Sequence, residues 1–102
     1  MAAVDLTTLD FSNGGATYVQ ALSTTTWQEI QIPNWAKLVT VQPKNQAIYF
    51  SYNATDGATV GAQRFSQAAD SIVQYNPLQT RHVRSLFFAA QTGTVSLELL
   101  FE

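Results

Sequence analysis

The side chain best suited to acid–base chemistry at neutral pH is His82, the single histidine of the chain. Arg81 and Arg84 flank it, and Ser85 offers a hydroxyl three residues further on. The Gly-x-Ser-x-Gly turn that presents a nucleophilic serine in α/β-hydrolases is absent from the sequence. Because no spacing singles out the pair of His82 and Ser85, we predict no catalytic site. A small hydrolase that uses His82 is therefore a weaker hypothesis than a structural or a binding role.

Metal and cofactor sites are not indicated by the sequence. The seven acidic residues are scattered along the chain, and residues 53–57 (Asn-Ala-Thr-Asp-Gly) are similar to only part of a calcium-binding loop. The chain has no cysteine, which excludes disulfides, cysteine-ligated zinc, iron–sulfur clusters and thiol catalysis. We therefore expect no metal, no cofactor and a turn at residues 53–57.

The charge balance bears on possible partners. A net charge of −2 and a pI near 5.1 argue against a surface that neutralises nucleic-acid phosphates. The first basic residue is Lys37, and the longest apolar run, residues 86–90, is far shorter than the ~20 residues of a membrane helix. We expect no nucleic-acid partner, no signal peptide and no transmembrane segment.

Large aromatic and arginine side chains are the candidates for binding. Trp35 follows Pro33 in a turn, where it is either part of the core or an exposed anchor for a sugar or a protein. Trp27 lies on the otherwise polar face of its segment, which makes it a candidate contact with another subunit. The three arginines could hold a partner's carboxylate or remain solvated, and they are Arg64, Arg81 and Arg84.

Turn-forming residues divide the chain into short segments in which apolar and polar residues alternate, as in half-buried strands. Such patterns predict strands over residues 4–9, 16–22, 26–32, 36–42, 47–53, 71–75, 82–90 and 94–102. Residues 91–93 (Gln-Thr-Gly) are typical of a hairpin loop, so we predict that the last two strands pair. The one helix-like window covers residues 62–69 and could equally be a loop.

The 102 residues are enough for one domain, residues 1–102, with a single core. Seven or eight short strands with at most one short helix predict an all-β fold, an antiparallel β-sandwich of the jelly-roll or immunoglobulin-like type. The 12% of charged residues is about half the usual share. The final strand ends in residues 97–102 (Leu-Glu-Leu-Leu-Phe-Glu), which have apolar side chains on both faces, Leu100 among them, with only Glu98 and Glu102 charged. This pattern favours cover by a partner, in a homo-oligomer or on a larger assembly, and a monomeric sandwich that covers the strand itself would give the same pattern.

In its general sequence pattern, most of the chain resembles the short β-sandwich cement or decoration proteins of tailed bacteriophages. The resemblance rests on IPNW at residues 32–35 leading into LVTV at 38–41, on YFSYNATDG at 49–57, and on SLFFAAQTGTV at 85–95. It implies a non-enzymatic virion protein, assembled in the host cytoplasm, that binds the outer surface of a capsid and bridges subunits of the major capsid protein. It also implies a homo-oligomer, with a trimer favoured, and it transfers no functional residues.

Two alternatives remain beside the capsid role. Related small virion proteins form part of the head–tail junction or the tail. A β-sandwich with a loop aromatic such as Trp35 could instead be a carbohydrate- or receptor-binding module.

Overall fold

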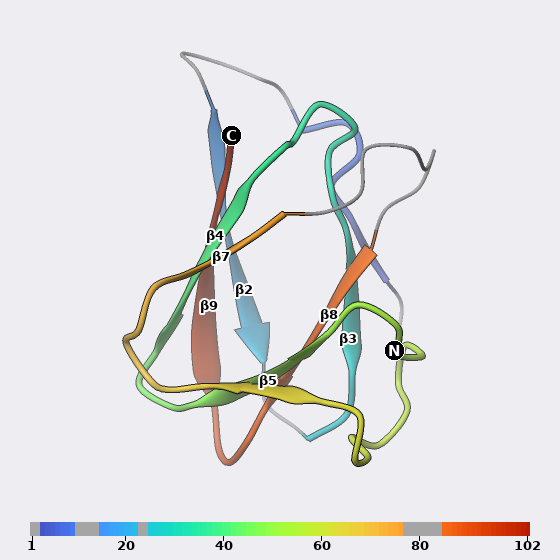
Figure 1. The fold of residues 1–102 in the computed structure, drawn as a ribbon, viewed down its shortest axis with the longest axis vertical. Helices are drawn as coiled ribbons and strands as arrows, with labels where there is room; N and C mark the ends of the chain where they lie inside the picture. Colours follow the sequence, from blue (N-terminus) through green and yellow to red (C-terminus); the bar gives the residue numbers. More distant parts are fainter. Residues whose placement is uncertain (1–2, 10–14, 23–24, 77–84) are drawn as a thin grey trace.

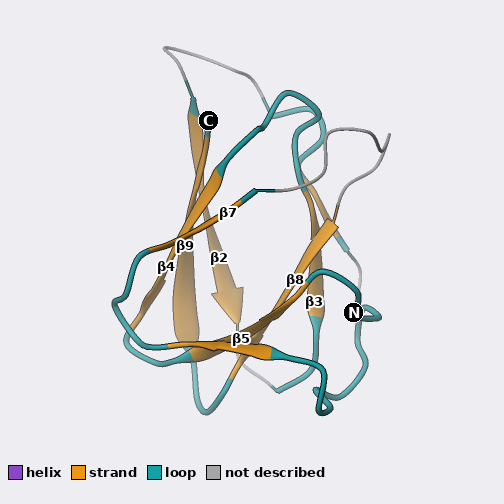
Figure 2. Cartoon of the chain, viewed as in Figure 1, coloured by secondary structure: helices purple, strands orange, loops and turns teal. Residues whose placement is uncertain are grey.

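The computed structural model describes residues 3–9, 15–22, 25–76 and 85–102, and in these residues it contains strands and loops but no helix (Figure 2). The prediction of an all-β chain is confirmed. The strands are β1 (Val4–Asp5), β2 (Ala16–Leu22), β3 (Gln28–Gln31), β4 (Val39–Lys44), β5 (Ile48–Ser51), β6 (Phe65–Gln67), β7 (Val73–Tyr75), β8 (Ser85–Ala90) and β9 (Val95–Phe101).

The strands form two sheets (Figure 1), and the main apolar core lies between them. One sheet has the order β1-β3-β8-β5-β6 and the other β2-β9-β4-β7. The short β1 runs parallel to β3, and every other neighbouring pair is antiparallel. Four of these pairs are nested along the chain: β2 with β9, β3 with β8, β4 with β7, and β5 with β6. The strands β6 to β9 therefore pair, in reverse order, with the strands β2 to β5, as the two arms of one long folded hairpin would.

The predicted hairpin between the last two strands is wrong. β8 pairs with β3 and β5, whereas β9 pairs with β2 and β4, so residues 91–93 carry the chain from one sheet to the other. Gly93 adopts a φ of 65° at this connection, a conformation that glycine accepts without strain. A short glycine-containing loop permits either connection, and burial of both faces of β8 places it inside a sheet.

Two further connections cross between the sheets in the same region. The corner between β4 and β5 contains Asn45 with a φ of 83°, and the corner between β6 and β7 contains Asp70 with a φ of 61°. Asn and Asp tolerate this left-handed region better than other side chains. The Asp70 amide donates to the Pro43 carbonyl over 2.7 Å, and the Gln91 amide donates to the Ala47 carbonyl over 3.0 Å. These bonds join the corners to one another.

The core lies between the sheets and follows the period-two alternation of the strands. The largest fully buried apolar side chains come from both sheets, and they are Phe88, Phe101, Ile30, Ile32, Ile48, Leu86, Leu97, Val39, Val41 and Val95. Gln67 is the notable polar member: its Nε2 donates to the Val41 carbonyl over 3.0 Å, and its Oε1 accepts the Tyr75 hydroxyl over 3.0 Å. Among the described residues, no buried side-chain polar atom lacks a partner.

The helix-like window at residues 62–69 contains β6 instead of a helix. The strand pairs with β5, with Phe65 opposite Phe50 and Gln67 opposite Ile48. The buried bonds of Gln67 favour this pairing over a solvated helix. The other predicted segments contain strands, and the one predicted over residues 16–22 coincides with β2.

Two phenylalanines of unequal burial test this description of the core. Phe88 is fully buried, whereas Phe65 is 57% exposed. We expect Phe88→Ala to lower the free energy of unfolding by about 3–5 kcal/mol, because it leaves a cavity in the core. The matched Phe65→Ala should change it by less than about 0.5 kcal/mol. Urea denaturation measures both values, and equal losses would contradict the assigned core.

Candidate functional site

The outer face of the five-stranded sheet is covered by the chain itself. The segment between β5 and β6 lies against it, with the Trp27 amide donating to the Ala58 carbonyl and the Gly57 amide donating to the Trp27 carbonyl, each over 2.8 Å. Beneath this segment Trp27 packs in a second small core with Phe87 and Ala89. As expected, Trp27 lies on the face of its segment that points away from the main core, but it is only 4% exposed. Contrary to its expected role as a contact with another subunit, it is buried within its own chain.

Residues 53–57 form the expected turn within this covering segment. Asp56 Oδ1 accepts the backbone amide of Glu29 over 3.0 Å, and Gly57 adopts a φ of 81°. The carboxylate therefore fixes the covering segment to β3. In the part of the chain that the structure describes, no group of three or more His, Cys, Asp or Glu residues is placed to hold a metal ion.

In the part of the chain that the structure describes, no segment covers the outer face of the four-stranded sheet. We call this the open sheet face, and its outward residues are Thr17, Val19, Ala21, Thr40, Gln42, Lys44, Ile72, Gln74, Ser96, Glu98 and Leu100. Only Lys44 and Glu98 among these are charged. Val19 and Ile72 are 60% and 65% exposed, and a depression of about 460 Å³ lies between them. The face is a low-charge surface of threonine, glutamine and aliphatic side chains.

The open sheet face ends at β2, which is an edge strand with seven residues and no charged residue or proline. No described strand pairs with its free side. The other three edge strands, β1, β6 and β7, have only two or three residues each. Short edges offer few unpaired backbone groups, whereas a long uncharged edge is a template for another strand.

The expectation that a partner covers the final strand needs correction, because neighbouring strands of the same chain flank this strand on both sides. β9 is central, because β2 and β4 pair with its two sides and its inward residues are buried in the core. Among the described strands, the long edge without a charged residue, a proline or a second partner strand is β2. Leu100 does face outward and is half-buried on the open sheet face, so its role at an interface stays a prediction.

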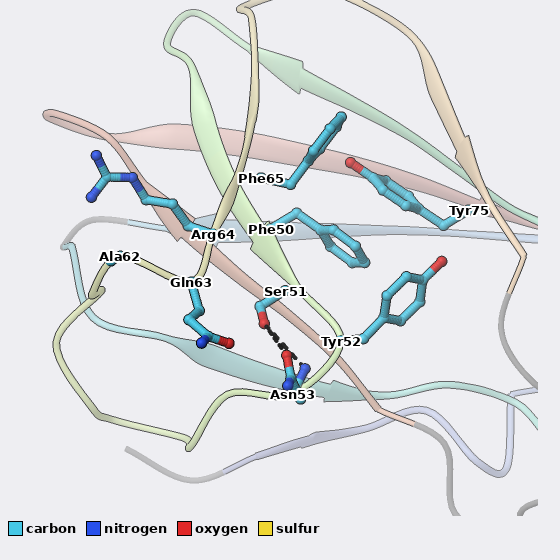
Figure 3. Close-up of a pocket in the computed structure, with 9 residues that line it drawn as sticks. All are labelled: Phe50, Ser51, Tyr52, Asn53, Ala62, Gln63, Arg64, Phe65 and Tyr75. Carbon is cyan, nitrogen blue, oxygen red and sulfur yellow. Dashed lines mark hydrogen bonds between the residues drawn. The ribbon is translucent and has the colours of Figure 1, made fainter.

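A second feature lies on the side of the sandwich where β6 and β7 end the two sheets. Here a depression of about 510 Å³, which we call the aromatic pocket, is lined by residues 50–53, residues 62–65 and Tyr75 (Figure 3). The Phe50 and Tyr75 rings stack with their centroids 3.9 Å apart, and the Tyr52 ring meets Phe50 edge-on at 4.8 Å. Tyr52 and Phe65 are 52% and 57% exposed. The pocket is thus an aromatic cluster that is continuous with the core and open to solvent.

Arg64 lies at the rim of this pocket. Its side chain is exposed, its guanidinium carbon lies 4.6 Å from the centroid of the Tyr49 ring, and its Nη1 donates to the Gly61 carbonyl over 3.2 Å. The cation–π contact and the hydrogen bond together orient the charge. The contact with Tyr49 and the bond to Gly61 fit the intramolecular interpretation of Arg64, and its role at an interface stays a prediction.

Trp35 is half-buried, packs against the main core and donates its indole N–H to the Leu9 carbonyl over 3.0 Å. These contacts favour the interpretation of Trp35 as a core residue over that of an exposed anchor.

Ser85 donates its hydroxyl to Glu29 Oε2 over 2.6 Å. Arg81, His82 and Arg84 lie outside the described residues.

The residues that sequence reasoning missed are Val19 and Ile72 on the open sheet face and Phe65 in the aromatic pocket. The available signal for Val19 is the absence of charge and proline from residues 16–22. The alternation of residues 47–53 does not decide whether Tyr52 is a core or a surface residue. Phe65 lies in the window of residues 62–69, whose helical spacing does not indicate a strand. Neither position identifies a pocket without the tertiary fold.

No protein-family model matches the chain, and no curated protein or solved structure is significantly similar to it. The described residues form no helix with the length and apolar character needed to cross a bilayer.

Because the phenol of Tyr75 is buried, the free energy of unfolding should depend on pH in the alkaline range. Burial, with a smaller contribution from nearby Tyr52, raises the pKa of Tyr75 from 10.0 to about 12. Between these values the folded chain keeps a proton that the unfolded chain loses, so the free energy of unfolding falls as pH rises from about 10 to about 12. We expect Tyr75→Phe to remove part of this decline, because it removes the phenol. Denaturation at a series of pH values measures the slopes, and an unchanged slope in Tyr75→Phe would count against the assignment.

Proposed function

We propose that this protein is a non-enzymatic structural subunit of a virion, which binds the outer surface of a phage capsid through the major capsid protein and stabilises the shell. One observation carries the proposal: the open sheet face ends at a seven-residue edge strand without charge. A low-charge face beside an unpaired edge is what a chain with a permanent partner exhibits, because an isolated sheet needs protection at both. The resemblance to phage cement proteins supplies the kind of partner.

The nested strand pairs support a more specific fold, and we propose a jelly roll. In a jelly roll, eight antiparallel strands wrap as a folded hairpin across two four-stranded sheets. Strands β2 to β9 match this description, since β2, β9, β4 and β7 form one sheet and β3, β8, β5 and β6 the other. β1 is then an addition at the edge of the second sheet.

The size of the open sheet face bears on how docking works. Four strands about 4.8 Å apart, with seven, seven, six and three residues, make a face of roughly 400 Å². A standard interface buries about 800 Å² on each partner, or about twice this area. The β2 edge can add backbone hydrogen bonds to a strand of the shell, and several copies held together can add avidity.

Stabilisation of the shell then follows from mass action. A subunit that binds the assembled shell but not its dissociated parts adds about 2.7 kcal/mol per site when its free concentration is 100 times its Kd. No catalytic group is required.

A homotrimer is the oligomeric state that we propose. Light scattering on the purified protein at micromolar concentration should give the mass of three chains, each of 11.2 kDa. A mass of one or two chains under the same conditions would contradict the trimer, although not docking itself.

Val19→Glu tests the docking surface. Its carboxylate would face the partner from the centre of β2, directly opposite the carboxylate of Glu98, so docking would bury two like charges. We expect binding to purified capsids that lack the protein to weaken about tenfold or more, which corresponds to ~1.4 kcal/mol. Ala58→Glu adds the same charge to an exposed position over the opposite sheet and should bind as the wild type does.

The experiment measures the amount of protein that cosediments with capsids and the temperature at which the capsids break. Capsids that bind no wild-type protein, or that withstand heat equally well without it, would refute the cementing role. Binding to tails but not to capsids would transfer the protein to the tail.

A further inference from the structure

The aromatic pocket is separate from the open sheet face and has no role in the proposed docking. It is formed by the end of β5, the start of β6 and Tyr75 of β7, on the side where the two sheets end in three-residue strands. In contrast, the free edge of β2 lies at the other end of the four-stranded sheet. A chain docked through β2 would therefore leave the pocket exposed.

The aromatic rings of the pocket divide into a fixed floor and an exposed rim. Phe50 and Tyr75 form the floor: both are buried, their ring planes are 30° apart, and the Tyr75 hydroxyl is held by Gln67. Tyr52 and Phe65 form the rim and expose more than half of their surface. Phe65 lies directly opposite Phe50 in the β5–β6 pairing, so its ring projects beside the floor. The exposed rings are thus positioned by buried neighbours.

Polar side chains without negative charge stand next to these rings. Asn53 and Gln63 are exposed, and Figure 3 shows the Gln63 amide directed toward Ser51 and Asn53. The Ser51 hydroxyl and the Asn53 amide oxygen are hydrogen-bonded over 3.1 Å. Arg64 supplies the positive charge at the rim, and none of the described residues that line the pocket is acidic. Planar amides beside exposed rings offer both donors and acceptors to a ligand that has an apolar face.

We propose that the aromatic pocket binds a saccharide, with the C–H face of a pyranose ring against Tyr52 or Phe65 and its hydroxyl groups hydrogen-bonded by Asn53 and Gln63. The pocket volume of about 510 Å³ lies within the range of roughly 300–1,000 Å³ that is usual for small-molecule sites. An extended peptide is the less favourable ligand. It would need to pair with β6, and that edge has only three residues.

Saturation-transfer NMR tests this proposal directly on the full chain. The probes are glucose, galactose, mannose, N-acetylglucosamine and glucuronic acid, each added at millimolar concentration. We expect transfer to the ring protons of at least one of these sugars. In titrations with that sugar, Phe65→Ala and Tyr52→Ala should each weaken binding about tenfold or more, which corresponds to ~1.4 kcal/mol.

Ile72→Ala is the matched control, because Ile72 is an apolar residue with similar exposure that lies on the open sheet face. It should bind the sugar as the wild type does, and Phe65→Ala should still bind capsids. Absence of transfer to every sugar, or equal affinity of both rim variants and the wild type, would overturn the proposal. Transfer to a proline-rich peptide but to none of the sugars would overturn it in favour of a peptide site. Because the readouts differ, the saccharide site and capsid docking can fail independently.

Discussion

The packing of two sheets against one apolar layer is the constraint on which the rest of this structure depends. Each strand must direct alternate residues into that layer, and the chain must cross from one sheet to the other to close it. Three crossings depend on backbones with positive φ at Asn45, Asp70 and Gly93. Gln67 extends the same constraint into the polar part of the interior, because its amide joins β6 to β4 and to the Tyr75 hydroxyl. The aromatic pocket inherits its fixed floor from this packing.

The two outer faces of the sandwich differ in whether the chain covers them, and the functional proposals rest on this difference. One face buries Trp27 and Phe87 under residues of its own chain, and the carboxylate of Asp56 helps to fix that cover. The other face has no such cover among the described residues and ends at the uncharged β2. An uncovered, low-charge sheet beside a long free edge fits a protein partner, whereas the pocket on the far side fits a small ligand. A shell protein with this arrangement could hold its capsid and still present a binding site outward.

Alternation and turn residues were sufficient to locate most strands. The pattern in residues 94–102 predicted the strand that β9 occupies, and Asp56 and Gly57 form the expected turn. The hairpin prediction failed because a short loop with glycine does not reveal whether its flanking strands share a sheet. The helical spacing of residues 62–69 failed for a related reason: alanine and glutamine have weak preferences, and the pairing of β6 with β5 decided the conformation.

By itself, the sequence determined that the chain is all-β, because apolar periodicity and turn chemistry are local properties that act over a few residues. It also determined the low charge of the surface. Only the tertiary structure decided which faces are covered: Trp27, directly before β3, and Val19 of β2 both occupy outward positions, yet Trp27 is buried and Val19 is exposed. The physical reason is that cover comes from segments distant along the chain, as Ala58 is from Trp27. For the same reason, the juxtaposition of Tyr75 with Phe50 and Tyr52 arises from the meeting of two sheets, which no local pattern encodes.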